Sequence, residues 1–285
     1  MASTNNVTEL IIVGLFQDPE MQRMCFVIFL PVYLATVVGN GLIVLTVSVS
    51  KSLNSPMYFF LSYLSLVEIS YSSTVVPEFI TDLLPKIKTI SLEGCVAQIF
   101  FFHFLGVTET FLLTVMTYDH YVAICKPLHY TTIMSRPVCH LLVAGFWLGG
   151  FFHSMVQVIF TLHLSFCGPN VIDHYFCDLP PLFKISSGLF SVFSFLLLVS
   201  SYIIILVNLR NHSAEGRHKA FSCASHITAV ILFFGPAIFL YMWPPSTFTE
   251  DKLMAVFYTV VMPMLNPIIY TLRNAEMKIE DRHGC

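Results

Sequence analysis

The stretch GCVAQIFFFHFLGVTETFLLTVMTYDHY, from Gly94 to Tyr121, is almost entirely apolar and contains neither Lys nor Arg. A bilayer core about 30 Å thick is crossed by about 20 helical residues, so this stretch is long enough to span a membrane. Its two carboxylates, Glu109 and Asp119, need partners because a charged group is costly in hydrocarbon. The stretch therefore predicts a transmembrane helix that carries functional polar groups.

The composition of the whole chain is typical of a membrane protein. Of 285 residues 56% are hydrophobic and 11% are charged, against about 25% charged in soluble domains. The mean hydropathy is +0.76, and a net charge of -3 gives no argument for binding nucleic acid. The first residues lack a basic region and a cleavage site, so we expect the first span to direct membrane insertion.

Seven apolar runs of this kind follow one another, separated by short polar turns. They cover residues 25–49, 57–84, 94–121, 138–162, 188–209, 220–243 and 253–272. The sequence predicts an all-α membrane protein, a single seven-transmembrane helix bundle over residues 1–285.

The positive charges predict the orientation of this bundle. Nine Lys and Arg residues flank one side (Lys51, Lys126, Arg136, Arg210, Arg217, Lys219, Arg273, Lys278, Arg282) and five flank the other (Arg23, Lys86, Lys88, Lys184, Lys252). Cytoplasmic loops carry the excess, which places the C-terminus in the cytoplasm and the N-terminus outside. Asn6 then lies in an Asn-Val-Thr glycosylation sequon on the outer side.

Three cysteines fall on the predicted outer side, where the environment is oxidising: Cys95, Cys167 and Cys177. Their positions alone leave open a bond from Cys95 to Cys177, a local bond from Cys167 to Cys177, or no bond. At least one of the three stays unpaired in every case.

Polar residues inside the spans predict a buried cluster. Asn40, Glu68 and Glu109 each lie roughly 16–18 Å from the cytoplasmic end of their helix, and Asn266 is a candidate fourth member. Two carboxyl groups in a low dielectric share a proton or a cation. The cluster is therefore either a cation or proton site, or a hydrogen-bonded lock between helices.

Five motifs resemble those of olfactory receptors, which are rhodopsin-like class A G-protein-coupled receptors. They are GNGLIVL (39–45), PMYFFLSYLSLVEI (56–69), YDHYVAICKPLHY (118–130), KAFSCASHI (219–227) and PMLNPIIYTLRN (263–274). They run from the first span to the last, in an order that agrees with the topology above.

The resemblance implies a multi-pass receptor of the plasma membrane that binds a small volatile odorant. It implies activation of a stimulatory, olfactory-type heterotrimeric G protein that raises cyclic AMP, with the lipid bilayer as the other partner. It also implies a Cys95–Cys177 disulfide. No cofactor is implied beyond a sodium ion between Glu109 and Glu68, where relatives usually have Asp in place of Glu68.

The resemblance also implies two sets of site residues. Coupling and activation residues are Asp119, His120, Tyr121, Asn266, Pro267 and Tyr270. Ligand-binding residues are His103, Gly106, Val107, Asp178, Leu179, Phe234, Ile238, Tyr241 and Thr259. Helical spacing alone is also compatible with a plain core role for the apolar members. His103, placed among phenylalanines, is the strongest polar candidate.

Three departures from the family pattern stand out. The lead from Cys177 into the fifth span is short, which predicts loss of the outer turn of that span and leaves Cys167 without its usual partner. KAFSCASHI lacks one residue before Cys223. In a helix this deletion would rotate the part before it by about 100° relative to the part after it. His120 replaces the family's Arg; an imidazole offers fewer donors and is mostly neutral at pH 7, so we expect weaker coupling unless the family tolerates this variant.

Two alternatives remain. One is a degenerate receptor with impaired folding or coupling. The other is a proton-coupled transporter using Glu68, Glu109 and intramembrane histidines, although the sequence has neither repeats nor matching broken helices. We expect no enzyme, since no nucleophile, metal-ligand or phosphate-loop motif is present.

Overall fold

The computed structural model describes residues 9–50, 53–83, 89–163, 171–172, 174–177, 181–210, 227, 230–238 and 248–269. Its elements are β1 (Glu9–Ile12), α1 (Pro19–Val49), α2 (Pro56–Thr81), β2 (Thr89–Ser91), α3 (Leu92–Cys125), η1 (Pro127–His129), α4 (Tyr130–Ile133), α5 (Arg136–His163), β3 (Val171–Ile172), α6 (Pro181–Arg210), a helix over 230–238, α8 (Phe248–Val256) and the π-helix η2 (Phe257–Val261). Helical structure continues from η2 to residue 269.

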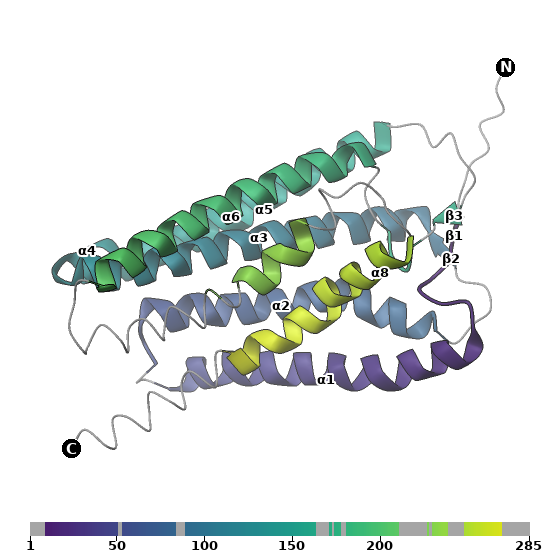
Figure 1. Cartoon of the computed structure of the whole chain (residues 1–285), viewed down its shortest axis with the longest axis horizontal. Helices are drawn as coiled ribbons and strands as arrows, with labels where there is room; N and C mark the ends of the chain where they lie inside the picture. The colour runs from purple at the N-terminus through teal and green to yellow at the C-terminus, as the bar shows by residue number, and fades with distance from the viewer. Residues whose placement is uncertain are drawn as a thin grey trace.

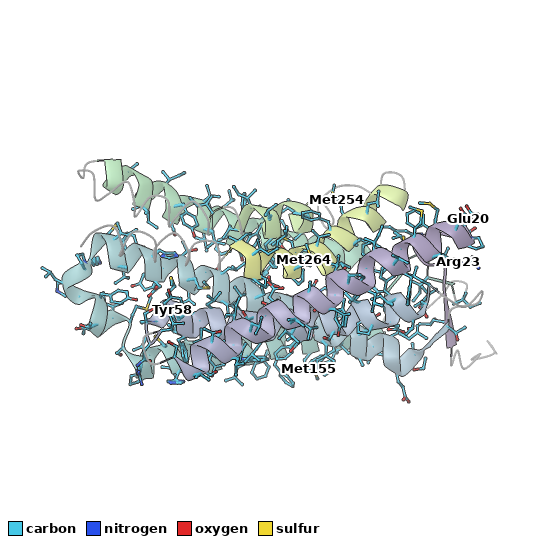
Figure 2. All side chains as sticks on the ribbon, turned by 90° about the horizontal axis from the view of Figure 1, so that it is seen from below. Glu20, Arg23, Tyr58, Met155, Met254 and Met264 are labelled. Carbon is cyan, nitrogen blue, oxygen red and sulfur yellow. A yellow bond between two sulfur atoms is a disulfide. The ribbon has the colours of Figure 1, made fainter. Side chains whose placement is uncertain are left out.

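The long helices form a bundle around α3, with α1 at one edge of the view and α6 at the other (Figure 1). Within the residues that the structure describes, six helical segments are long and apolar enough to cross a membrane (19–49, 56–81, 92–125, 136–163, 188–205 and 252–269). Figure 2 shows Glu20 and Arg23 together at one end of α1, where that span begins. The membrane-spanning bundle predicted from hydropathy is confirmed. Of the predicted span 220–243, residues 227 and 230–238 are described, and they are helical.

The prediction that the fifth span has lost its outer turn is wrong. Helix α6 begins at Pro181, seven residues before the predicted start at Gly188, and has 30 residues. Its length of about 45 Å exceeds the bilayer core. Proline is favoured in the first turn of a helix, where its missing N–H costs nothing, so Pro181 begins the helix rather than delaying it.

Glycines allow α5 and α1 to approach their neighbours closely. A Cβ added to Gly150 would lie 2.8 Å from the Phe104 carbonyl oxygen and 2.6 Å from Thr108 Oγ1, both on α3. A Cβ on Gly39 of α1 would lie 3.3 Å from Pro267. Small residues at helix crossings are a common means of bringing membrane helices together.

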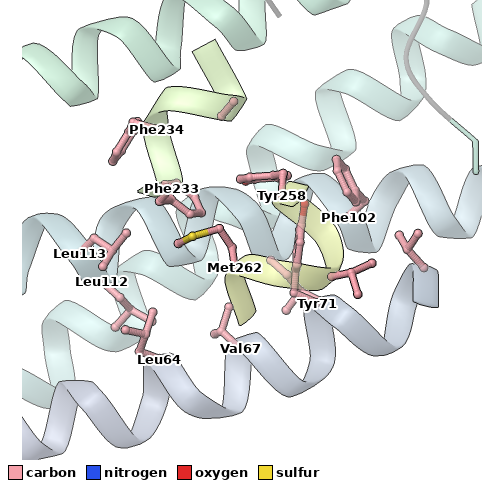
Figure 3. Close-up of a cluster of buried hydrophobic side chains, with 14 of the residues drawn as sticks. Leu64, Val67, Tyr71, Phe102, Leu112, Leu113, Phe233, Phe234, Tyr258 and Met262 are labelled. Atoms are coloured by element: carbon pink, nitrogen blue, oxygen red, sulfur yellow. The ribbon is translucent and has the colours of Figure 1, made fainter. Parts of the chain in front are cut away.

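The buried core joins side chains from several helices (Figure 3). The residues labelled there are Leu64, Val67, Tyr71, Phe102, Leu112, Leu113, Phe233, Phe234, Tyr258 and Met262, and all are at least 97% buried except Tyr258, which is 6% exposed. Many other large apolar side chains, such as Val27 and Leu45 on α1, point outward. That outward apolar surface suits a chain whose solvent is lipid.

A small sheet, absent from the all-α prediction, covers one end of the bundle. Strand β1 lies between β2, to which it is antiparallel, and β3, to which it is parallel. Its Leu10 and Ile12 are buried in a cluster with Ile90 and Cys177. We call this the disulfide end, because Cys95 and Cys177 are bonded there, and the opposite end of α3 the His120 end. Strands of two to four residues are too short to give a recognisable alternation in sequence.

Candidate functional site

A small cavity of about 40 Å³ lies inside the bundle toward the disulfide end of α3. Helix α3 lines one wall with Phe102, His103, Gly106, Val107 and Thr110. The other walls are His153 of α5, Phe190 and Ser191 of α6, Phe233 of the 230–238 helix, and Tyr258 of η2. Aromatic walls with a few polar groups form the environment that binds small, mostly apolar molecules.

Three of the nine expected ligand-binding residues line this cavity: His103, Gly106 and Val107. Phe234 and Thr259 are fully buried elsewhere; Phe234 packs against Phe195 and Phe233.

Ile238 is partly buried and packs against the hydrophobic core, and it does not line this cavity. Asp178, Leu179 and Tyr241 lie outside the described residues.

Sequence reasoning missed the other seven cavity residues: Phe102, Thr110, His153, Phe190, Ser191, Phe233 and Tyr258. A histidine inside the fourth span was itself a signal, because ionisable residues in membrane helices usually face the bundle interior. Phe190 and Ser191 had no such signal, since one is an ordinary apolar residue and the other is a common small residue in membrane helices.

The stretch His174–Cys177, which we call the cover, packs against the cavity residue Phe102 toward the disulfide end. All four residues are at least 92% buried. The Tyr175 hydroxyl and Thr259 Oγ1 are hydrogen-bonded at 2.9 Å, and the ring of Phe176 lies 5.1 Å from that of Phe102.

The disulfide fixes the cover. Cys177 is bonded to Cys95, with Cα atoms 5.4 Å apart, and its backbone N–H donates to Gln98 Oε1 at 2.8 Å. This is the pairing that the family resemblance implied. Cys167, the expected unpaired cysteine, lies outside the described residues.

A polar cluster lies deeper in the bundle, as the common depth of its members predicted. Asn266 Nδ2 donates to Glu68 Oε1, and the carboxyl groups of Glu68 and Glu109 interact directly. Both glutamates are at least 98% buried. Asn40 instead donates to the carbonyl oxygens of Thr36 and Pro263, at 3.1 and 3.0 Å. The cluster of Glu68, Glu109 and Asn266 thus connects α2, α3 and the last span. Asn40, which was expected to join it, separately connects α1 to the last span through Pro263.

Two oxygen atoms of this cluster, Glu68 Oε2 and Asn266 Oδ1, are buried without a hydrogen-bond partner. Oxygen ligands suit a hard cation such as sodium, so the donor set fits one. Within the described part of the chain, no group of three or more His, Cys, Asp or Glu residues is arranged to hold a metal ion. A cation here would therefore be held by two carboxyl groups and an amide.

At the His120 end, Asp119 accepts a hydrogen bond from an unexpected donor. The hydroxyl of Tyr130, in α4, donates to Asp119 Oδ1 at 2.8 Å. Burial and the neighbouring Asp119 carboxylate raise the pKa of Tyr130, so the phenol keeps its proton and acts as the donor. Asp119 and His120 are both buried, and Tyr121 stacks on Tyr118 with ring centroids 6.2 Å apart.

In the last span, Asn266 lies next to α2, because it is hydrogen-bonded to Glu68. Pro267 lies next to α1, where it faces Gly39. Asn6, Cys223 and Tyr270 lie outside the described residues.

The fold and these sites are those of a membrane-spanning receptor, and comparison with known sequences gives the family. A sequence model described as "Olfactory receptor" matches residues 29–282. The human protein Olfactory receptor 4B1 is 76% identical over 297 aligned positions, covering 99% of this chain and 96% of the relative. Mouse Olfactory receptor 4B13 is 68% identical, covering 98% and 96%, and human Olfactory receptor 4S2 is 56% identical, covering 98% and 94%.

The chain belongs to the olfactory receptor family. Members of this family are odorant-sensing G-protein-coupled receptors, which are not enzymes in general, and the chain is a multi-pass protein of the plasma membrane.

The alignment with Olfactory receptor 4B1 extends over more positions than the 285 residues of this chain. That relative therefore carries residues that this chain lacks, in agreement with the expectation that material is missing.

Proposed function

We propose that the chain is an odorant receptor whose cavity between α3, α5 and α6 binds small, mostly apolar molecules. In this proposal the bound receptor activates a stimulatory olfactory-type G protein and raises cyclic AMP. The observation that carries it is the cavity, lined by His103, Gly106 and Val107, inside a chain of the olfactory receptor family.

His103 is the proposed polar anchor for the ligand. Its side chain is 93% buried, and its ring meets that of Phe102 edge-on at 5.3 Å. A neutral imidazole has one donor and one acceptor, so it can bind a carbonyl or a hydroxyl group. The aromatic walls contribute apolar contact area, and a cavity this small favours ligands of few atoms.

The proposed orientation places the N-terminus and the disulfide end outside the cell and the His120 end in the cytoplasm. The excess of positive charge beside one set of span ends supports it. The Cys95–Cys177 bond adds support, since disulfides form in oxidising compartments. Asn6 is then a glycosylation site.

We assign the polar cluster a sodium ion held by Glu68, Glu109 and Asn266. The two unpartnered oxygen atoms support this assignment. A cation also offsets the repulsion between two buried carboxyl groups. Bound there, it would stabilise one arrangement of α2, α3 and the last span.

Coupling to the G protein is assigned to Asp119, His120 and Tyr121 on α3, with Asn266, Pro267 and Tyr270 as the activation motif of the last span. His120 weakens this assignment, because an imidazole cannot replace the five donors of an arginine. A receptor that reaches the membrane but signals poorly is therefore the second candidate.

The test is a cyclic AMP response across an odorant panel in cells that express the chain, with an antibody count of receptors on intact cells. At least one small apolar odorant should raise cyclic AMP with a saturable dose dependence, whereas cells lacking the chain should not respond. A surface-delivered chain that answers no odorant contradicts the proposal and favours the degenerate receptor. Solute uptake without cyclic AMP would favour a transporter.

A further inference from the structure

We propose that ligands reach the cavity from within the bilayer, through a lateral portal between α5 and α6 that His153 and Phe190 close. The inference rests on the proposed function in taking this cavity as the ligand site. It adds the route of access and the pair of residues that controls it.

The disulfide end offers a poor route from water. The cover is buried, and Phe176 lies against the cavity residue Phe102. The Tyr175–Thr259 hydrogen bond and the Cys95–Cys177 disulfide hold this cover at both ends. Strand β1, packed on the same cysteines, lies at this end as well. Access from this side would require the cover to lift against all of these contacts.

The cavity walls differ in their exposure. Phe102, His103 and Val107 of α3, with Phe233 and Tyr258, are buried. The residues contributed by α5 and α6, His153, Phe190 and Ser191, are only partly buried. The exposure of the lining is thus greatest where α5 and α6 face each other.

One ring pair bridges α5 and α6 at this place. The rings of His153 and Phe190 lie 5.6 Å apart, tilted by 33°. Both helices pack on α3, and the ring of Phe190 also meets that of Phe111 on α3 edge-on at 6.0 Å. In this proposal the portal opens when the side chains of His153 and Phe190 change rotamer. Rotamer changes of partly exposed side chains are fast compared with helix or loop motion.

The portal opens onto lipid. Its flanking residues Phe152 on α5 and Leu189 and Phe193 on α6 are large, apolar and 57–65% exposed. Small apolar molecules concentrate in hydrocarbon, since their transfer from water is favourable. A lateral route therefore draws ligand from the phase in which it is most abundant.

The test uses 3-phenyl-3-(trifluoromethyl)diazirine, an uncharged aromatic photolabel that partitions into bilayers, with the full-length chain in cell membranes. Samples are irradiated at increasing times after addition of the probe. Labelling at Phe102 and His103 themselves is measured by tandem mass spectrometry, which separates it from labelling at the neighbouring exposed residue Phe101. The readout requires neither a known odorant nor signalling, so it can fail independently of the proposed function.

Two variants form a matched pair, because each removes the same atoms from a cavity wall. Phe190→Ala opens the portal, whereas Phe233→Ala enlarges the cavity at a buried wall. We expect Phe190→Ala to speed labelling of the cavity residues on α3 at least threefold. Phe233→Ala, which enlarges the cavity itself, should change the final extent of labelling without speeding its approach to that extent. Phe193→Ala, on the lipid face of α6, should leave the rate unchanged. Recovery of the Cys95–Cys177 peptide confirms folding of each variant, and Phe190→Leu replaces any Phe190→Ala chain that fails this check.

A third comparison tests the other route. If Phe176→Ala at the cover speeds labelling and the Phe190 variants do not, ligand enters from the disulfide end and the proposal is wrong. Equal rates in the parent, Phe190→Ala and Phe190→Leu chains also overturn it.

Discussion

Gly150 is the position where a single added methyl group should disturb the bundle most clearly. In Gly150→Ala, the new Cβ would lie 2.8 Å from the Phe104 carbonyl oxygen and 2.6 Å from Thr108 Oγ1. Real Cβ atoms essentially never approach other heavy atoms within 3.0 Å, and the Phe104 contact is to backbone. Helix α5 must therefore move away from α3, the helix that carries the cavity wall.

The size of the effect follows from two opposing contributions. Overpacking of this kind costs about 1–3 kcal/mol. Alanine also favours the helix over glycine by about 0.8–1 kcal/mol. Gly145→Ala is the matched control on the same helix, because its added Cβ would meet nothing within 4 Å and so keeps only the favourable contribution. The two variants should differ in unfolding free energy by roughly the full overpacking cost.

The assay is thermal unfolding in detergent with a thiol-reactive fluorophore, which reports the exposure of buried Cys25 and Cys139. Gly150→Ala should melt several degrees below Gly145→Ala, since about 1 kcal/mol shifts the melting temperature of a chain of 150–250 residues by about 2–4 °C. Equal melting temperatures for the two variants would refute the close approach of α5 to α3.

Three further predictions concern the two ends of the bundle. Tyr130→Phe removes the hydroxyl that donates to buried Asp119. The loss should destabilise the chain by about 1.5–3 kcal/mol, or by less where water replaces the donor. The melting temperature should fall while labelling of the cavity stays unchanged. His120→Arg should raise the maximal cyclic AMP response without changing which odorants act, measured at matched surface expression; equal basal and maximal signals would leave His120 as a tolerated variant. Peptide mapping without reduction should recover Cys95 bonded to Cys177, with Cys167 alone, and a Cys167–Cys177 peptide would contradict this.

Hydropathy was sufficient to predict the spanning helices, because the bilayer imposes length and composition on them. The common depth of Asn40, Glu68 and Glu109 also predicted a cluster, with Asn266 as a candidate fourth member. Glu68, Glu109 and Asn266 do meet, whereas Asn40 donates to backbone carbonyl oxygens instead. The start of α6 was missed because the predicted span was taken from the apolar run that begins at Gly188, whereas the helix begins at Pro181, where proline fits the first turn.

The details of the ligand site could not be predicted in the same way. Which helical face points inward depends on crossing angles, and these place His153 and Phe190 in the cavity wall while leaving Thr259 bonded to Tyr175. Tyr130 reaches Asp119 only because the chain turns after α3, a geometry set by η1 and α4 rather than by the triplet itself.

The measurement that tests the central claim most directly is a cyclic AMP dose response in chains whose cavity is filled. Gly106 lines the cavity, and an added Cβ there would make ordinary contacts at 3.6 Å or more. Gly106→Val therefore attaches its Cβ without a clash, and its two methyl groups reduce the space in the cavity. Gly235→Val, whose added Cβ would meet nothing within 4 Å, is the matched control. At equal surface counts, the parent and Gly235→Val should respond to the same odorants and Gly106→Val should not. A Gly106→Val response equal to that of the parent, or no response from the surface-delivered parent, would contradict the account.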